Sequence, residues 1–295
     1  MDIDFLLRVS CMTYNHAPYI EDAMNGFCMQ ETTFPFVCII IDDASTDGEQ
    51  EVISHYIEVF FDLEDKTIVR NEETEDYRLV FARHKTNLNC YFVVLLLKYN
   101  HYSISKPRML YVKEYIDTKY VAICEGDDYW IHPLKLQMQV NYLNSHPEAG
   151  LVYTEIDRYI QDKSHFEREY FKSRPIKNTH EDFVLNSWFL APCTWLYRSE
   201  LSKMIPDLNP LKCFKGDILM LLTFSKYSQV RFINEVTAVY RVLKKSASHF
   251  DTPLQEMNFW LKIKNTRLYF ARDCSFVVKL KLAFLLIRGY ASRIR

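Results

Sequence analysis

The stretch VCIIIDDASTDGEQEVISHYIEVF, residues 37–60, decides the fold class. Residues 37–42 form a continuous apolar run that ends in an acid, as expected for a strand buried on both faces of a parallel sheet. A helix is predicted over 46–60, because Thr46 and Glu49 have the spacing of a capping box. The apolar stripe of this helix consists of Val52, Ile53, Tyr56, Val59 and Phe60. A buried strand followed by an amphipathic helix predicts an α/β protein.

The same alternation extends to both sides of this stretch. Further strands are predicted at 6–12, 66–70, 120–124 and 150–154, and further helices at about 18–29 and from Pro133 onward. This pattern favours a mainly parallel sheet flanked by helices. Residues 72–119 fit the pattern poorly and are interpreted as an insertion of partly helical character. The second half is less regular and rich in aromatic residues, and without a clear linker we expect one continuous body.

The bulk composition suits a globular protein with a sizeable core. The 295 residues are 48% hydrophobic, and 36 Lys and Arg against 38 Asp and Glu give a formal net charge of −2. Charge alone therefore gives no reason to expect a nucleic-acid partner. The charge is uneven, since residues 262–295 hold nine Lys or Arg and a single acid, Asp273.

The cysteines and the start of the chain indicate a reduced, cytoplasmic protein. The eight cysteines include no CxxC pair, and several lie in apolar runs where cysteine behaves as a small hydrophobe. The opening MDIDFLLRVS has acids where a secretory signal needs lysines. No apolar run approaches the roughly 20 residues that span a bilayer.

Two acidic clusters follow predicted strands. Asp42 and Asp43 end the run at 37–42, and the stretch CEGDDYW places Glu125, Asp127 and Asp128 directly after an apolar run. In open α/β sheets, ligands bind at the carboxyl ends of the strands. Carboxylates there suit ribose hydroxyls and hard cations, and Mg²⁺ or Mn²⁺ completes its shell with phosphate oxygens and water. The alternative for Asp42 and Asp43 is a solvated turn.

Five segments in order resemble family 2 inverting glycosyltransferases with the GT-A fold, of the bacterial surface-polysaccharide type whose branch carries EGDDYW. They are SCMTYNHAPYI at 10–20, IIIDDASTDG at 39–48, CEGDDYWIHPLKLQMQV at 124–140, KGD at 215–217 and VYRVLKKSASH at 239–249. The resemblance implies a nucleotide-sugar donor, with UDP favoured by family habit, and Mn²⁺ or Mg²⁺ as the metal. It also implies single-displacement transfer to a hydroxyl of a glycan or lipid-linked acceptor.

The resemblance also implies an organisation. One GT-A domain is expected over 1–250, with a Rossmann-like donor half at about 1–154, interrupted by the insertion at about 72–119. A less regular acceptor half is expected at about 155–250. A basic amphipathic helical tail is expected over 251–295.

Roles for single residues come from the same resemblance. Asp217 stands where the family has its catalytic base, and Asp127 stands where it binds the metal, with His249 as a further metal ligand. Residues on the donor nucleotide side are Tyr14, Asp42, Asp43, Glu125, Asp128 and Arg241, with Tyr240 beside Arg241. Glu125 departs from the strict DxD pattern, and the segment 72–119 lacks a family motif.

Several of these residues have a structural alternative. Tyr14 is either a base contact or a core aromatic, and Arg241 either a phosphate contact or part of a surface ion pair. Asp217 is either the base or part of a plain turn, and His249 is either a ligand or a solvated loop residue. Acceptor contacts or core packing are the two options for Trp130, Trp188 and Trp195.

The basic end KLKLAFLLIRGYASRIR, residues 279–295, mixes large apolar side chains with Lys and Arg. A helix lying on an anionic membrane has this composition. So does a helix docked on the body with its cationic side in water. The first alternative places the protein peripherally on the inner face of the cell membrane.

Three rival functions are open. A sugar-phosphate nucleotidyltransferase needs a glycine-rich phosphate loop after the first strand, but the chain has six glycines and none before Gly26. A metal phosphohydrolase needs more metal ligands, and the nine histidines do not cluster with the aspartates. A non-catalytic nucleotide- or glycan-binding protein with a decayed transferase site differs from the enzyme only by its lack of turnover.

Overall fold

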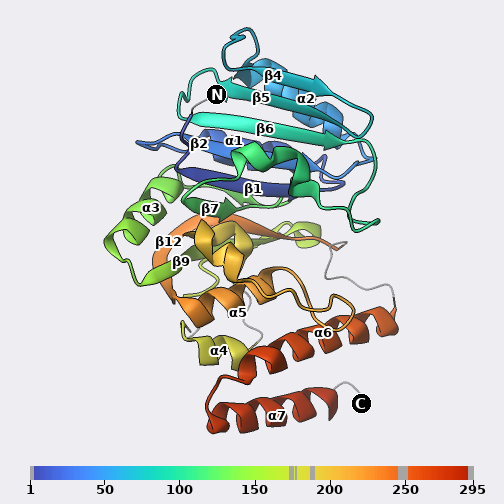
Figure 1. Ribbon diagram of the computed structural model, residues 1–295, viewed down its shortest axis with the longest axis vertical. Coiled ribbons are helices and arrows are strands. Elements are labelled where there is room, and N and C mark those ends of the chain that lie inside the picture. Colours follow the sequence, from blue (N-terminus) through green and yellow to red (C-terminus); the bar gives the residue numbers. More distant parts are fainter. Residues whose placement is uncertain (1–2, 173–175, 177, 187–189, 245–251, 292–295) are drawn as a thin grey trace.

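A computed structural model describes residues 3–172, 176, 178–186, 190–244 and 252–291 (Figure 1). The α-helices are α1 (Ile20–Cys28), α2 (Glu49–Phe60), α3 (Lys135–Ser145), α4 (His180–Leu185), α5 (Asp217–Tyr227), α6 (Pro253–Ala271) and α7 (Phe276–Ala291). The 3-10 helices are η1 (Arg108–Tyr115), η2 (Gln161–Lys163), η3 (Pro192–Thr194) and η4 (Ser199–Met204).

The strands of the described residues form one mixed sheet. They are β1 (Leu7–Thr13), β2 (Phe36–Asp42), β3 (Phe61–Asp62), β4 (Arg70–Glu73), β5 (Tyr77–His84), β6 (Cys90–Leu97), β7 (Tyr120–Ile123), β8 (Tyr129–Trp130), β9 (Ala149–Ile160), β10 (His165–Glu167), β11 (Leu196–Arg198) and β12 (Gln229–Val242). The strand order is β3-β5-β6-β2-β1-β7-β11-β9-β12-β8, while β10 pairs with β9 and β4 with β5.

The centre of the sheet is parallel. Strands β6, β2, β1 and β7 are neighbours that all run in one direction. Every residue of β2 and β6 is buried, as the continuous apolar run at 37–42 predicted for β2. The predicted strands at 6–12, 37–42 and 120–124 are confirmed, and their carboxyl ends meet at one edge. The α/β class with a mixed sheet flanked by helices is likewise confirmed.

The two faces of the sheet carry separate cores. On one face, Ile40 and Val94 pack with Ile53 and Ile57 of α2. On the other, alternate residues of the same strands pack with Val112 and Tyr115 of η1. Figure 1 shows α1 and α2 behind these strands and η1 in front of them.

Two local predictions are wrong. The capping box of Thr46 and Glu49 does not form, since α2 begins at Glu49 after Gly48, whose positive φ of 91° suits glycine. Residues 66–68 form a turn instead of a strand, because the backbone N–H groups of Ile68 and Val69 both donate to the Asp65 carbonyl at 2.9 Å. The strand begins only at Arg70.

The segment 72–119 contains two long strands of the main sheet, β5 and β6. Strand β6 pairs in parallel with β2, and β5 pairs antiparallel with β6, so residues 77–97 extend the main sheet. Only η1 has helical character. The interpretation of this segment as a partly helical insertion is therefore wrong for its strand-forming part, because its apolar run at 91–97 is a buried strand.

The C-terminal part consists of helices stacked beyond the sheet. Helices α4, α5 and α6 pack on one another, and α7 packs on α4 and α6 at the end of the molecule (Figure 1). Among the described residues, no helix combines the length and apolar character that a membrane span requires.

Candidate active site

The carboxyl ends of β1, β2 and β7 carry three loops that meet at one edge of the sheet. Glu49 joins the first two, because its buried carboxylate accepts hydrogen bonds from the side chain of Thr13, from His16 N (2.8 Å) and from Ser45 Oγ (2.8 Å). Burial raises the pKa of Glu49, and these donors lower it in part. Asn15 and Ala44 both have positive φ, at 58° and 62°. Strained backbone at two strand ends is typical of a functional site.

The Asp42 and Asp43 side chains are both buried, which excludes a solvated turn for them. Asp42 Oδ1 accepts hydrogen bonds from Ser45 N and the Gln50 amide, whereas its Oδ2 is buried without a partner among the described residues. Asp42 therefore fixes the turn that leads into α2.

Asp43 is held by a segment that the sequence had not connected to the site. Its two carboxylate oxygens accept hydrogen bonds from His101 N at 2.7 Å and Tyr102 N at 3.0 Å, and Arg108 Nη1 lies 3.4 Å away. Arg108 also lies over the Tyr102 ring. These residues could not be predicted as part of the site, because they lie in 72–119, which has no family motif.

The EGDD loop presents its acids in different ways. Asp128 is buried, and its Oδ1 accepts a hydrogen bond from Arg241 N at 2.8 Å. Asp127 is partly exposed, and its Oδ2 lies 3.9 Å from Nε2 of His16, another residue that the sequence analysis did not single out. Glu125 is exposed, but the surrounding protein still desolvates its carboxyl group. This combination is expected of a group that lines a concave surface.

The electrostatics of the loop favour a bound cation. Desolvation, followed by repulsion from Asp127 and Asp217, raises the pKa of Glu125 to about 7, and the positive charge of Arg108 opposes this rise. Burial and the charge of Asp127 likewise raise the pKa of Asp128 well above its usual value. A positive charge at this place would relieve the repulsion between the carboxylates.

Asp217 is the first residue of α5 and directly follows Gly216, so the KGD motif forms the start of this helix. The Asp217 carboxylate accepts a hydrogen bond from Ile218 N at 2.8 Å, and burial raises its pKa. The Asp217 charge contributes to the raised pKa of Glu125, so the two carboxyl groups lie close enough to interact although they are 92 positions apart in the sequence. A carboxylate with a raised pKa is suited to general base catalysis.

Arg241 has a structural role that neither sequence alternative described. Its guanidinium donates to the Asp127 carbonyl oxygen at 2.9 Å and pairs with Asp22 of α1. It also lies 4.4 Å from the ring centroid of Tyr129 and 5.0 Å from that of Tyr19. Arg241 is buried, so it ties β12 to the EGDD loop rather than standing free at the surface.

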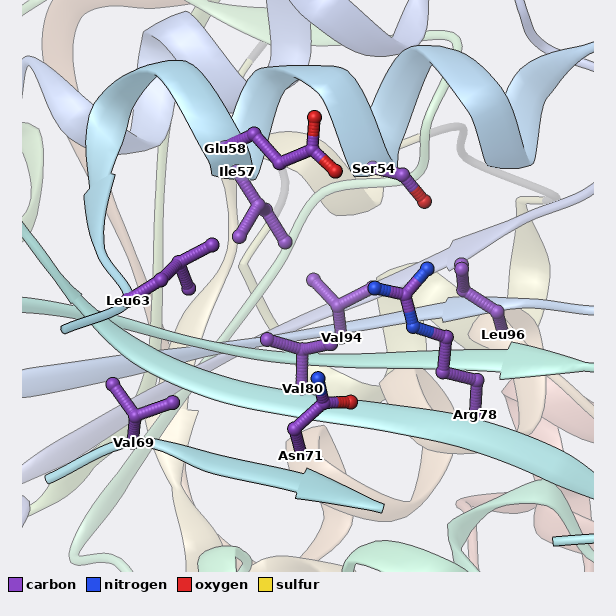
Figure 2. A pocket seen from close by; sticks show the side chains of 10 residues that line it. All are labelled: Ser54, Ile57, Glu58, Leu63, Val69, Asn71, Arg78, Val80, Val94 and Leu96. Carbon is purple, nitrogen blue, oxygen red and sulfur yellow. The ribbon is translucent and has the colours of Figure 1, made fainter. Parts of the chain in front are cut away.

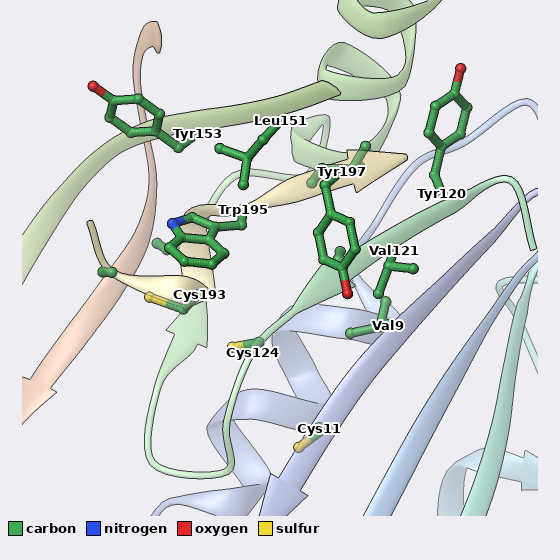
Figure 3. Close-up of a cluster of buried hydrophobic side chains, with 14 of the residues drawn as sticks. Val9, Cys11, Tyr120, Val121, Cys124, Leu151, Tyr153, Cys193, Trp195 and Tyr197 are labelled. Carbon is green, nitrogen blue, oxygen red and sulfur yellow. The ribbon is translucent and has the colours of Figure 1, made fainter. Parts of the chain in front are cut away.

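The aromatic candidates for the site differ in how deeply they are buried. Tyr14 is 44% exposed, so it is not a core residue and remains a candidate for the nucleotide base. Trp130 is buried against Phe27 and donates to the Cys193 carbonyl at 2.8 Å. Trp195 is buried among Cys124, Cys193 and Tyr197 (Figure 3). The acceptor role is therefore wrong for Trp130 and Trp195, whereas Trp188 and His249 lie outside the described residues.

The residues present fit a cation of one particular kind. No group of three or more potential metal ligands occurs within the described part of the chain. A closed, protein-only metal site is therefore not what these residues form. Asp127, partly exposed among repelling carboxylates, fits a Mg²⁺ or Mn²⁺ ion whose remaining ligands are phosphate oxygens and water.

A small cavity of about 70 Å³ lies elsewhere, between α2 and strands β4–β6 (Figure 2). Its lining includes Ile57, Leu63, Val80 and Val94, with Arg78 and Glu58 at its side. None of the site residues above lines it, so it is not part of the candidate active site.

Comparison with solved structures agrees with this architecture. Staphylococcus aureus TarS, residues 1–349, superposes with a TM-score of 0.59 at 18% identity, covering 97% of this chain and 72% of that one. The same TarS fragment in complex with UDP-GlcNAc gives a TM-score of 0.56 at 17% identity and the same coverage. The fold, with acidic loops at the carboxyl ends of its parallel strands, is an α/β fold of the GT-A type.

Sequence comparison gives a match to a known family over part of the chain. The family described as "Glycosyl transferase family 2" matches residues 10–84, which contain the loops after β1 and β2. Over these residues the chain is similar to that family.

Its relatives are distant. An uncharacterized protein of Mycobacterium tuberculosis, Rv1520, is 27% identical over 235 residues, which is 80% of this chain and 58% of that protein. The putative teichuronic acid biosynthesis glycosyltransferase TuaG of Bacillus subtilis is 22% identical over 269 residues, covering 90% of this chain and 91% of TuaG. The chain therefore spans a little more than half the length of the mycobacterial relative.

Proposed function

We propose that this protein is a metal-dependent inverting glycosyltransferase that moves a sugar from a nucleotide diphosphate to an acceptor hydroxyl. The proposal rests on Glu125 and Asp127 in the loop after β7 and on Asp217 at the start of α5, because burial and then the charges of Asp127 and Asp217 raise the pKa of Glu125. Two of these carboxyl groups have raised pKa values and the third is partly exposed. Such a set serves a reaction in which one carboxylate holds a cation and another takes up a proton.

In this mechanism each residue has a separate task. Asp127 would hold Mn²⁺ or Mg²⁺ together with the donor diphosphate. When bound, the cation supplies positive charge that stabilises the departing diphosphate. Asp217 removes the proton of the acceptor hydroxyl as that oxygen bonds to the anomeric carbon, and the bond from that carbon to the diphosphate breaks. Asp43 and Asp128 hold the surrounding loops in place through buried hydrogen bonds.

The donor is proposed to be a UDP-sugar, and the acceptor a glycan or lipid-linked glycan of a surface polysaccharide. TarS, which has the same fold, has been crystallised with UDP and with UDP-GlcNAc. TuaG, a relative along nearly its whole length, carries a name that refers to teichuronic acid synthesis. The TarS complexes support UDP as the first nucleotide to test, and the name of TuaG supports a surface polysaccharide as the acceptor.

The first test is calorimetric titration of the protein with UDP, GDP and dTDP, each with Mn²⁺ and with a chelator. We expect one nucleotide to bind with Mn²⁺, and this binding to disappear with the chelator and in Asp127→Asn. The control is Asp4→Asn, an exposed aspartate near the opposite end of β1. Unchanged Mn²⁺-dependent affinity in Asp127→Asn would remove this residue from the metal site.

A second test separates binding from chemistry. Asp217→Asn should keep the nucleotide affinity within about twofold and lower UDP release from the bound UDP-sugar by about 100-fold or more, since a general base contributes about 10² to 10⁴ in rate. The release is measured in the presence and absence of glycan acceptors. Full turnover in Asp217→Asn would show that this carboxylate is not the base. Nucleotide binding without any turnover in the wild type would instead favour a non-catalytic binding protein.

A further inference from the structure

Helix α7 turns one face toward the body of the protein. Val278 and Leu282 are buried there, and Leu286, one turn further on, is partly buried against the same core. Because successive residues of an α-helix are about 100° apart, these three lie along one stripe. The helix packs on α4 and α6 through this side.

The opposite side of α7 is also apolar, although it faces away from the body. Five large residues lie there within an arc of about 100° opposite Leu282. They are Phe276 (73% exposed), Ile287 (70%), Phe284 (65%), Val277 (57%) and Leu280 (55%). These five residues are the outer face of α7. The fold itself does not explain why one helix exposes so much apolar surface to solvent.

Cations flank this face. Lys279 and Lys281 are both exposed and lie on opposite sides of the outer face in the helical projection. The sequence from 262 to 295 as a whole has nine Lys or Arg against Asp273 alone. Lysines at the border of an apolar face can reach the lipid headgroup level while the face itself is buried.

The apolar surface continues from α7 to its neighbour. An open groove of about 550 Å³ lies between α4 and α7, and Leu185, Leu280, Phe284 and Leu285 form most of its wall. Both helices lie at the end of the molecule furthest from β4 and β5 (Figure 1). Because these helices lie at the end of the molecule away from β4 and β5, their apolar side chains can approach a planar surface without obstruction from those strands.

We propose that the outer face of α7 docks the protein on an anionic lipid membrane, with the helix lying in the plane of the interface. The apolar side chains would enter the boundary between headgroups and acyl chains, and the lysines would contact anionic headgroups. A second copy of the chain is a poorer occupant, because two such faces packed together would bring their flanking lysines close to one another. The proposal rests on α7 and does not depend on the proposed function.

The test is cosedimentation with vesicles of phosphatidylcholine alone and of phosphatidylcholine with an equal amount of phosphatidylglycerol. We expect binding to the anionic vesicles that is at least about tenfold tighter than to the neutral ones and weakens with salt. Phe276→Ser/Phe284→Ser should lower the affinity at least about tenfold. Lys279→Gln/Lys281→Gln should lower it and reduce the effect of salt.

The matched control is Leu88→Ser/Leu211→Ser, which removes two exposed apolar side chains outside α7 and should leave binding unchanged. All substituted side chains are exposed, so the fold should persist, as circular dichroism would verify. No binding by the wild type, or equal binding by the Phe276→Ser/Phe284→Ser variant, would overturn the proposal. So would a dimer in light scattering that this variant dissociates. Nucleotide titrations of the same variants should be unaffected, which keeps a failure here separate from a failure of the proposed function.

Discussion

At the level of single residues, the acids of the candidate active site have two different functions. Asp43 and Asp128 are buried, and each accepts backbone hydrogen bonds that fix a loop. Asp127 and Glu125 reach solvent beside them. A buried carboxylate is stable only when donors compensate its lost hydration. Asp43 and Asp128 therefore fix the loops of the site, and Asp127 and Glu125 remain to bind a ligand.

The residue types of this site could be predicted from the sequence. Which of the carboxylates fix loops and which reach solvent could not. The donors to Asp43 come from residues 101 and 102, and the donor to Asp128 is Arg241. These partners are 58 or more positions away in the chain. Only the folded chain shows which carboxylates are already satisfied. For the same reason, the sequence did not predict that Arg241 is a buried link between β12, α1 and the EGDD loop, while its contact with phosphate stays a prediction.

Gly126 allows the EGDD loop to approach β1. An alanine Cβ at this position would lie 2.1 Å from Thr13 Oγ1, and the Thr13 hydroxyl is itself bonded to the buried Glu49. Since Thr13 cannot move without breaking that bond, Gly126→Ala should displace the loop and with it Glu125 and Asp127. We expect the Mn²⁺-dependent nucleotide affinity to fall at least about tenfold, as measured by calorimetry, with a loss of stability of about 1–3 kcal/mol.

Gly150 offers a matched control for this substitution. An alanine Cβ there would lie 2.1 Å from Ser228 Oγ, an equally close contact, and next nearest to Ser228 Cβ and Leu201 Cδ1, none of which belongs to the site. Gly150→Ala should therefore be destabilised to a similar degree while keeping its nucleotide affinity. If both variants bind nucleotide equally well, the close approach of Gly126 to Thr13 does not control the site.

At the level of elements, the central strands were predictable because each is buried on both faces. Every position of β2 is apolar except the last, and such runs give an unambiguous signal. The run at 91–97 has the same character and is strand β6, but its place in the sheet depends on pairing with β2. Pairing between distant segments leaves no periodic pattern in the sequence, so this strand was assigned to an insertion.

The errors at 46–49 and 66–68 have a common cause. In both places a side chain makes a tertiary or local hydrogen bond that outweighs the intrinsic preference of the segment. Thr46 N donates to Asn15 Oδ1 at 2.8 Å, and Glu49 turns to Thr13 and His16 instead of capping its helix. Asp65 closes the turn at 66–68 with its carbonyl and its carboxylate. Polar side chains at element ends thus limit prediction more than the apolar runs do.

At the level of the whole molecule, one buried cation links stability to pH. Lys135, the first residue of α3, is fully buried, hydrogen-bonded to Gln139 and 4.5 Å from the ring centroid of Trp130. Burial lowers the pKa of Lys135 from 10.5 to about 7, and the buried thiols of Cys124 and Cys193 oppose this shift. In the unfolded chain the same amine would keep its ordinary pKa, so that unfolding between pH 7 and pH 10.5 takes up a proton.

The uptake of this proton on unfolding determines whether stability rises or falls with pH. Stability rises with pH wherever the unfolded state binds more protons, so the contribution of Lys135 should improve from pH 7 toward pH 10.5 and be least favourable near pH 7. Relative to Lys135→Met, the wild type should gain about 2 kcal/mol of unfolding free energy between pH 7 and pH 9. Urea titrations of both proteins at these two pH values measure the difference.

The comparison with Lys135→Met is needed because other groups also titrate in this range. The buried thiols of Cys11, Cys90 and Cys124 have raised pKa values, so they lose protons on unfolding and lower stability as pH rises. Their contribution is common to both proteins and largely cancels in the difference. Lys66→Met, at an exposed lysine, should show no such pH dependence against the wild type. A difference between wild type and Lys135→Met that stays constant from pH 7 to pH 9 would mean that Lys135 keeps its proton state on unfolding, with a solvated ammonium in the folded protein.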